Sequence, residues 1–251
     1  MKRMLLGMSM VAAMLLVASS AFAGGINIRW ADCFGDGGAS NRAFACASNL
    51  GSNPLVSSFS IDTDLLQSSG QEVVVDFISA NATLPAWWEF KNAGTCRLSS
   101  LSMNFVIPAT AVLCVDWASG AAAGGIGAYN SNLGSINPSF TGQHRRLVAA
   151  IAVPGTALAD LLANTEYFSN IISINNLKSI GTGSCAGCIE PVCIVFNSIK
   201  LTTQVAANDR ILGNPSVAGS NQATWQGGAG ANCAAVPTKN ATWSQVKSLY
   251  R

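Results

Sequence analysis

The chain of 251 residues carries 14 basic and 12 acidic side chains, and only 10% of its residues are charged. Lys2 and Arg3 account for the excess of +2, so the rest of the chain is formally neutral. No basic cluster is larger than Arg145-Arg146, which argues against binding to nucleic acid or to anionic lipid. The low charge and the 24 glycines also argue against a protein built from long helices.

Residues 1–23 have the organisation of a secretory signal peptide. Lys2 and Arg3 begin it, residues 10–17 form a short apolar run, and Ala21-Phe22-Ala23 matches a cleavage site. The apolar run is shorter than the roughly 20 residues that a membrane-spanning helix needs. We therefore expect a secreted protein, extracellular or periplasmic, that begins near Gly24 and has no membrane span after cleavage.

Strand-like segments with alternating or β-branched apolar residues recur along the chain. They cover residues 26–30, 55–61, 71–79, 84–90, 100–107, 111–117, 145–153, 167–175 and 192–203. Residues 32–41 and 120–134 are predicted loops, and residues 154–164 are predicted to hold one or two helical turns. In the last strand the apolar face changes phase after Phe196, which predicts a β-bulge near Asn197-Ser198.

These segments predict an all-β fold, an antiparallel β-sandwich of about eight to ten strands for which a jelly-roll is one arrangement. The sandwich domain is expected to cover residues 24–205. Residues 206–251 are expected to form a polar C-terminal extension. Thr242 and Gln245 match a capping box there, and Trp243, Val246 and Leu249 or Tyr250 share one helical face, so a short amphipathic helix is predicted.

Eight cysteines, an even number in a chain expected to be exported, predict up to four disulfides. Their order along the chain favours Cys33–Cys46 and Cys96–Cys114, with the remaining four pairing among themselves. Those four are Cys185, Cys188, Cys193 and Cys233. A zinc site or a redox-active thiol at Cys185-x-x-Cys188 is a weaker alternative, because neither a second metal-ligand pair nor a helix follows the motif.

Four tryptophans are the candidate ligand-binding residues. Trp87 and Trp88 are neighbours and would face opposite sides of a strand, so one of them could present an exposed indole to a sugar ring. Trp117 and Trp225 are the other candidates. The competing interpretation packs Trp87 and Trp88 together in the core.

The sequence predicts no catalytic residue, metal or cofactor. Its single histidine, His144, precedes two arginines that would lower its basicity, which argues against a histidine-dependent triad. Asp32, Asp36, Asp62 and Asp64 could contact a cation, but such residues more often cap turns and strand ends. Glycoside hydrolysis needs only two carboxylates, and five acidic residues lie in or near strands. These are Glu72, Asp76, Glu89, Asp116 and Glu166.

Two segments carry a resemblance to a family. The ending T-W-S-Q-V-K-S-L-Y-R resembles the T-W-G-x-[IVL]-K-x-L-Y-R endings of certain uncharacterised exported bacterial proteins, and the G-T-G-S-C-A-G-C…P-V-C-I-V segment from Gly181 resembles theirs as well. The chain departs from the pattern at Ser244, where glycine is expected. The resemblance implies a bacterial, exported β-protein and supplies no activity.

The sequence therefore favours an exported non-enzymatic protein, a structural or binding component of the adhesin, matrix or carbohydrate-binding kind. Its expected partner is a glycan or a cell-surface or matrix component. The first alternative is a secreted glycan-active hydrolase that uses paired carboxylates. The second is a redox or metal site at the Cys185 cluster.

Overall fold

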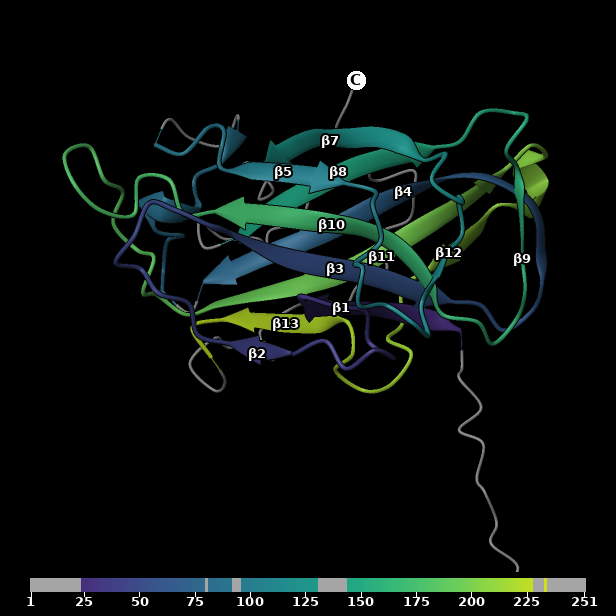
Figure 1. Cartoon of the computed structure of the whole chain (residues 1–251), viewed down its shortest axis with the longest axis horizontal. Helices are drawn as coiled ribbons and strands as arrows, with labels where there is room; N and C mark the ends of the chain where they lie inside the picture. The colour runs from purple at the N-terminus through teal and green to yellow at the C-terminus, as the bar shows by residue number, and fades with distance from the viewer. Residues whose placement is uncertain (1–23, 80, 92–95, 131–143, 228–232, 234–251) are drawn as a thin grey trace, which may run out of the picture.

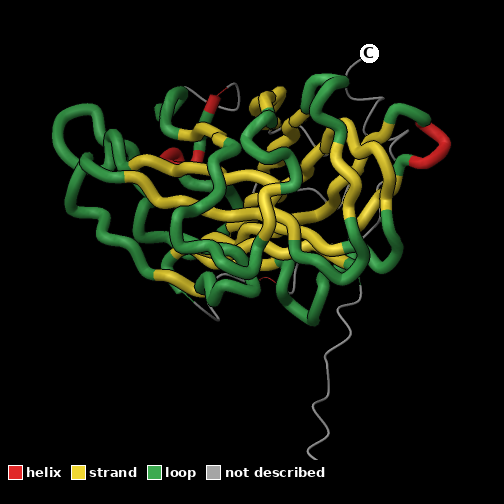
Figure 2. Tube along the Cα trace, turned by 45° about the vertical axis from the view of Figure 1, so that its right-hand side comes forward, coloured by secondary structure: helices red, strands yellow, loops and turns green. Residues whose placement is uncertain are grey.

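The structure is a computed structural model that describes residues 24–79, 81–91, 96–130, 144–227 and 233. Its strands form two sheets that lie face to face, as the sequence predicted (Figure 1). Strands cross the middle of the molecule while most loops gather at its ends, and the described residues hold little helix (Figure 2). None of the described helices is long and apolar enough to cross a membrane.

The smaller sheet, sheet A, has the order β1-β3-β10-β5, with β6 pairing with β10. Its strands are β1 (Gly25–Trp30), β3 (Ser52–Ser60), β5 (Leu101–Asn104), β6 (Val115–Asp116) and β10 (Tyr167–Asn175). The larger sheet, sheet B, has the order β2-β13-β11-β4-β8-β7, with β12 on β11 and β9 on β4. Its strands are β2 (Asn41–Arg42), β4 (Leu65–Ser79), β7 (Ala123–Asn130), β8 (His144–Ala152), β9 (Ala159–Leu161), β11 (Val192–Thr203), β12 (Arg210–Leu212) and β13 (Gln222–Trp225). Most pairs are antiparallel; β6–β10 and β2–β13 are parallel.

One apolar core fills the space between the sheets. Ile26, Ile28 and Trp30 enter it from sheet A, and alternate residues of β4 such as Val73 and Phe77 enter it from sheet B. The predicted bulge in β11 is confirmed, because the pairing of β11 with β4 shifts between Phe196 and Ser198. Because the bulge adds one residue to β11, the side chains of Phe196 and Ile199 point to the same side of sheet B. Both are fully buried in the same core.

Three local predictions were wrong. Residues 84–90 contain the short 3-10 helix η1 (Ala86–Trp88) rather than a strand. The predicted loop at 120–134 contains β7, and the predicted helical turns at 154–164 contain β9. In β7 the Cβ of an alanine at Gly124 would lie 2.1 Å from the Ala150 carbonyl oxygen, so this glycine permits close strand pairing rather than marking a loop.

The expected polar extension also contributes to the sandwich. A 3-10 helix, η4 (Ala206–Asn208), leads into β12, and β13 lies between β2 and β11 with Trp225 fully buried. Two strands beyond the boundary predicted at residue 205 therefore pair within sheet B. The predicted C-terminal helix and the signal-like segment lie outside the described residues.

A buried ion pair lies on the face of sheet B that points away from the core. Asp76 on β4 accepts two hydrogen bonds of 2.7 Å from Arg146 on β8, and Asn197 on β11 donates a third of 2.7 Å. Asp76 and Arg146 are 1% and 3% exposed. A bidentate pair with a further donor is the geometry that compensates the desolvation of two buried charges.

Replacing Asp76 by Asn should lower the free energy of unfolding by about 3 kcal/mol, because Arg146 then keeps a buried charge without its bidentate carboxylate. Denaturant unfolding measures this loss. Asp62→Asn is the matched control, since Asp62 is exposed, and it should change the free energy by less than about 0.5 kcal/mol. Equal effects of the two substitutions would contradict the proposed role of the pair.

All eight cysteines lie in described residues and form four disulfides. The predicted pairs Cys33–Cys46 and Cys96–Cys114 are wrong, whereas Cys193–Cys233 joins two of the four cysteines that were expected to pair among themselves. The bridges are Cys33–Cys114, Cys46–Cys188, Cys96–Cys185 and Cys193–Cys233. Strands of both sheets lie between the two cysteines of the first three bridges, so cysteines that are neighbours in sequence end on different parts of the sandwich. Only strands of sheet B are described between Cys193 and Cys233. The bridges span 40 to 142 residues, and each should stabilise the fold by about 3 to 5 kcal/mol through loop closure.

Tryptic digestion without reduction tests this pairing, because no Lys or Arg lies between Ser179 and Ile199. Peptide 179–200, which holds three cysteines, should remain linked to peptides 43–91, 92–97 and 211–239. Peptide 30–42 should be linked to 98–145 as a separate species. Mass spectrometry distinguishes this map from the sequence-order pairing, which would join 30–42 to 43–91.

Candidate ligand-binding pocket

The four candidate tryptophans do not form an exposed platform. Trp87, Trp88 and Trp225 are fully buried and Trp117 is 4% exposed. Trp225 lies at the centre of an aromatic cluster, with its ring centroid 4.9 Å from that of Trp87 and 5.3 Å from that of Trp88. The turn of η1 directs both neighbouring indoles inward, so the competing interpretation, two packed tryptophans, is the one observed.

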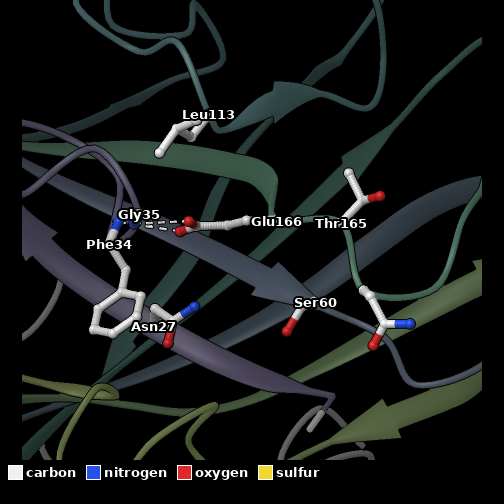
Figure 3. Close-up of a pocket in the computed structure, with 8 residues that line it drawn as sticks. Asn27, Phe34, Gly35, Ser60, Leu113, Thr165 and Glu166 are labelled. Atoms are coloured by element: carbon white, nitrogen blue, oxygen red, sulfur yellow. Dashed lines mark hydrogen bonds between the residues drawn. The ribbon is translucent and has the colours of Figure 1, made fainter. Parts of the chain in front are cut away.

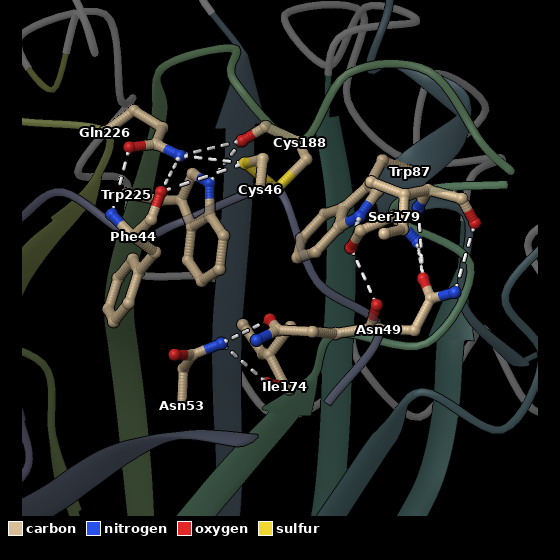
Figure 4. Close-up of a disulfide and its surroundings, with 12 residues drawn as sticks. Phe44, Cys46, Asn49, Asn53, Trp87, Ile174, Ser179, Cys188, Trp225 and Gln226 are labelled. Atoms are coloured by element: carbon tan, nitrogen blue, oxygen red, sulfur yellow. Dashed lines mark hydrogen bonds between the residues drawn. A yellow bond between two sulfur atoms is a disulfide. The ribbon is translucent and has the colours of Figure 1, made fainter. Parts of the chain in front are cut away.

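Two of the buried indole N–H groups, those of Trp87 and Trp225, have partners near the Cys46–Cys188 bridge (Figure 4). Trp225 Nε1 donates to the Cys188 carbonyl oxygen at 2.6 Å, and Trp87 Nε1 donates to Ser179 Oγ at 2.9 Å. These contacts assign the two indoles to the packing of the β10–β11 loop. The prediction of sugar binding at these tryptophans therefore loses its structural basis.

The Cys185 cluster is also structural. Cys185 and Cys188 bridge to different partners, Cys96 and Cys46, so the C-x-x-C segment holds no dithiol pair and no thiolates for zinc. Both residues are at most 5% exposed. The hypotheses of a redox-active thiol or a metal site at this cluster are therefore wrong.

Three of the four aspartates considered for cation binding accept hydrogen bonds from backbone N–H groups, and the fourth, Asp62, is exposed. Asp36 accepts hydrogen bonds from the backbone N–H groups of Val112, Leu113 and Cys114 at 2.8, 2.8 and 3.1 Å. Burial would raise the pKa of Asp36, but the three N–H donors outweigh it and lower that pKa. Asp32 accepts from the Cys33 N–H, and Asp64 accepts from the Ala163 N–H.

The strand-associated acidic residues also have structural partners. Asp76 pairs with Arg146, and Glu89 pairs with Arg145. Asp116 accepts from the backbone N–H groups of Ala118 and Gly120, and Glu72 lies opposite Lys200 in the register of β4 and β11. Of these five acidic residues, Glu166 is the one that lines the pocket on the outer side of sheet A.

His144 is buried at the start of β8, 1% exposed. Burial lowers its pKa, the nearby Asp76 raises it, and Arg146 lowers it further. The predicted direction is confirmed, although burial is the larger cause. His144 does not line the Glu166 pocket.

The Glu166 pocket lies on the outer side of sheet A, where the loop after β1 meets the turn before β10 (Figure 3). Its volume is about 350 Å³, near the lower end of the range of roughly 300–1,000 Å³ typical of ligand pockets. Its lining residues are Asn27, Phe34, Gly35, Ser60, Leu113, Asn164, Thr165 and Glu166. Cys33 and Cys114 form a disulfide, so their chain neighbours Phe34 and Leu113 are tied together as two walls of the pocket.

Glu166 is held in place by donors from two elements. Its Oε1 accepts from the Phe34 N–H at 3.0 Å and from the Ser58 hydroxyl, and its Oε2 accepts from the Gly35 N–H at 2.7 Å. A Cβ at Gly35 would lie 2.5 Å from Oε2, so glycine lets the loop approach the carboxylate. The carboxylate is thus fixed while remaining part of the pocket wall.

Asn27 supplies a polar group at the base of the pocket. It lies on β1 and is 1% exposed, and its Oδ1 has no hydrogen-bond partner within the described part of the chain. Buried side-chain polar atoms nearly always have a partner. A side-chain amide that lines a cavity and whose oxygen lacks a partner is expected where a ligand donates the missing hydrogen bond.

A second cavity of about 460 Å³ lies at the disulfide-rich end of the sandwich. Its two cationic residues are engaged with main-chain carbonyls. Lys178 Nζ donates to Cys96 at 2.7 Å, and Arg97 donates to Trp87, Asn175 and Leu177. Burial lowers the pKa of Arg97 to about 9, with Tyr129 acting in the opposite direction, so Arg97 remains a cation at neutral pH. These groups hold the chain together, which makes the Glu166 pocket the stronger candidate site.

Sequence reasoning named Glu166 only as one of several acidic residues, and it missed Asn27 and Phe34. Asn27 alternates with Ile26 and Ile28, a pattern that predicts a solvated outer position. No protein-family model matches the chain, and a search of curated proteins finds no significant relative. The pocket therefore rests on its own geometry.

Gly35→Ala should lower the free energy of unfolding by about 1 to 2 kcal/mol, because the added methyl group displaces Glu166 from its N–H donors. Gly155→Ala is the control, since its Cβ would meet no atom within 4 Å, and it should change the free energy by less than about 0.5 kcal/mol. Thermal or denaturant unfolding measures both. Indistinguishable variants would show that the Gly35–Glu166 contact has no energetic role.

Proposed function

We propose that this chain is an exported, non-enzymatic binding protein whose ligand site is the Glu166 pocket. Four disulfides and the described fold fit an oxidising compartment, extracellular or periplasmic. The signal-like organisation of residues 1–23 supports export. The observation that carries the binding role is the buried Asn27 amide, which lines the cavity beside the fixed carboxylate.

Binding is favoured over glycoside hydrolysis by the composition of the pocket. Hydrolysis of a glycoside usually requires two carboxyl groups on opposite sides of the scissile bond. Glu166 is the only acidic residue among those that line the pocket. Both oxygens of its carboxylate already accept hydrogen bonds, from two N–H groups and a hydroxyl, so they are engaged by the protein rather than directed only at a substrate.

A pocket-filling variant tests the location of the site. Ligand-observed NMR with a mixed set of sugars, amines, carboxylates and aromatic fragments should give binding signals with the unmodified protein. Thr165→Trp should reduce these signals at least about tenfold, because a large side chain would occupy the cavity. Thr63→Trp, at an exposed turn outside the pocket, is the matched control and should bind as the parent does. Absence of binding in every class, or equal binding by Thr165→Trp, would overturn the proposal.

The non-enzymatic assignment has its own test. Incubating the protein with neutral polysaccharides should release no new reducing ends. Release that disappears in Glu166→Gln but persists in Asp62→Asn would instead support the hydrolase alternative.

A further inference from the structure

We infer that the Glu166 pocket binds a neutral sugar, one ring of a glycan, through its hydroxyl groups. This inference rests on the proposed function and names the chemical class of the ligand. It places the sugar at Asn27, Phe34 and Glu166 rather than at the buried tryptophans.

The polar groups of the pocket suit hydroxyl ligands. Glu166 offers only acceptor oxygens, whereas Asn27 carries both a donor and an acceptor on one amide. Ser60, at the same surface, has its hydroxyl 3.3 Å from that of Ser216. A ligand that meets this set must donate to the carboxylate and also exchange hydrogen bonds with the amide. Each sugar hydroxyl can donate and accept at once, so adjacent hydroxyls satisfy both requirements.

Charge distinguishes a neutral ligand from an ionic one. No cationic side chain is among the residues lining the pocket, so an anion would meet the Glu166 carboxylate there without a cationic contact of its own. A cation gains less than usual, because Glu166 already accepts three hydrogen bonds. Arg29 adds positive potential nearby: burial lowers its pKa and the Glu166 charge raises it. A neutral hydroxyl compound incurs neither penalty.

The apolar walls match the C–H face of a sugar ring. Phe34 is half-buried, and the Arg29 guanidinium carbon lies 4.9 Å from its ring centroid. Arg29 is fixed there by hydrogen bonds to the carbonyls of Ser220 and Gln222 at 2.8 and 3.0 Å. Phe34 is therefore a positioned apolar wall of the pocket, and Leu113 is a second apolar residue of its lining. The cavity of about 350 Å³ suits one sugar unit rather than a long segment of polysaccharide.

The test compares neutral sugars with charged counterparts of similar shape. Glucose, galactose, mannose and N-acetylglucosamine are measured by saturation-transfer NMR against glucuronate and glucosamine. At least one neutral sugar should bind, and its uronate should bind at least about tenfold more weakly because of repulsion by Glu166.

Two variants locate the sugar. Asn27→Ala should weaken binding about tenfold through loss of an amide contact, while its free energy of unfolding stays unchanged or rises, since Oδ1 has no described partner. Phe34→Leu, which keeps an apolar side chain without the aromatic face, should also weaken binding. Asn170→Ala is the matched control: Asn170 is equally buried with a similarly unpartnered Oδ1, but it does not line the pocket.

The outcomes separate the two proposals. The sugar inference would be overturned if glucuronate, glucosamine or a fragment other than a sugar bound more tightly than every neutral sugar. If Thr165→Trp weakened that binding, the proposed binding role of the pocket would stand. Sugar binding unaffected by both Asn27→Ala and Phe34→Leu would also overturn it. Absence of binding by every class would overturn the proposed function together with the inference.

Discussion

The buried Arg97 guanidinium joins main-chain segments that the sheets do not connect. It donates to the carbonyl oxygens of Trp87, Asn175 and Leu177, and its carbon lies 3.4 Å from the centroid of the Trp87 ring. A buried cation is tolerated only when its donors are satisfied, and this one meets carbonyls and an aromatic face. The position of η1 and the course of the β10–β11 loop are consequently coupled, and the packing of Trp87 and Trp88 on Trp225 depends on both.

The Cys46–Cys188 and Cys96–Cys185 bridges reinforce the same end of the sandwich. Both fasten the β10–β11 loop to distant parts of the chain. The connection from β3 to β4 lies at the opposite end (Figure 1). Two of the four disulfides therefore fasten the long loop whose carbonyl and hydroxyl groups accept hydrogen bonds from Trp225 and Trp87. The cysteine-rich segment therefore has a stabilising role. Its C-x-x-C spacing resembles that of a reactive dithiol, but Cys185 and Cys188 are bonded to two different partners.

The Glu166 pocket has a different construction. Loops form it on the outer face of sheet A, while β1 and β3 supply its base through Asn27 and Ser60. The Cys33–Cys114 bridge ties together the loops that carry Phe34 and Leu113. A site on loops held by a rigid sheet and a disulfide can be preorganised without long-range movement. The same bridge therefore links stability of the fold to the shape of the proposed sugar site.

The sequence by itself determined the β class and most central strands, because period-two alternation and β-branched residues report which positions fit a half-buried sheet. It also predicted the bulge at Asn197-Ser198, since a phase change in one strand is a local signal. It failed at β7 and η1, where pairing with β8 or packing on Trp225 outweighs local composition. Tertiary structure alone decided the disulfide pairing and the burial of the tryptophans. It also decided that Asn27, Phe34 and Glu166 line one pocket. Each depends on contacts across many residues, and no local pattern encodes which distant segments the sheets bring together.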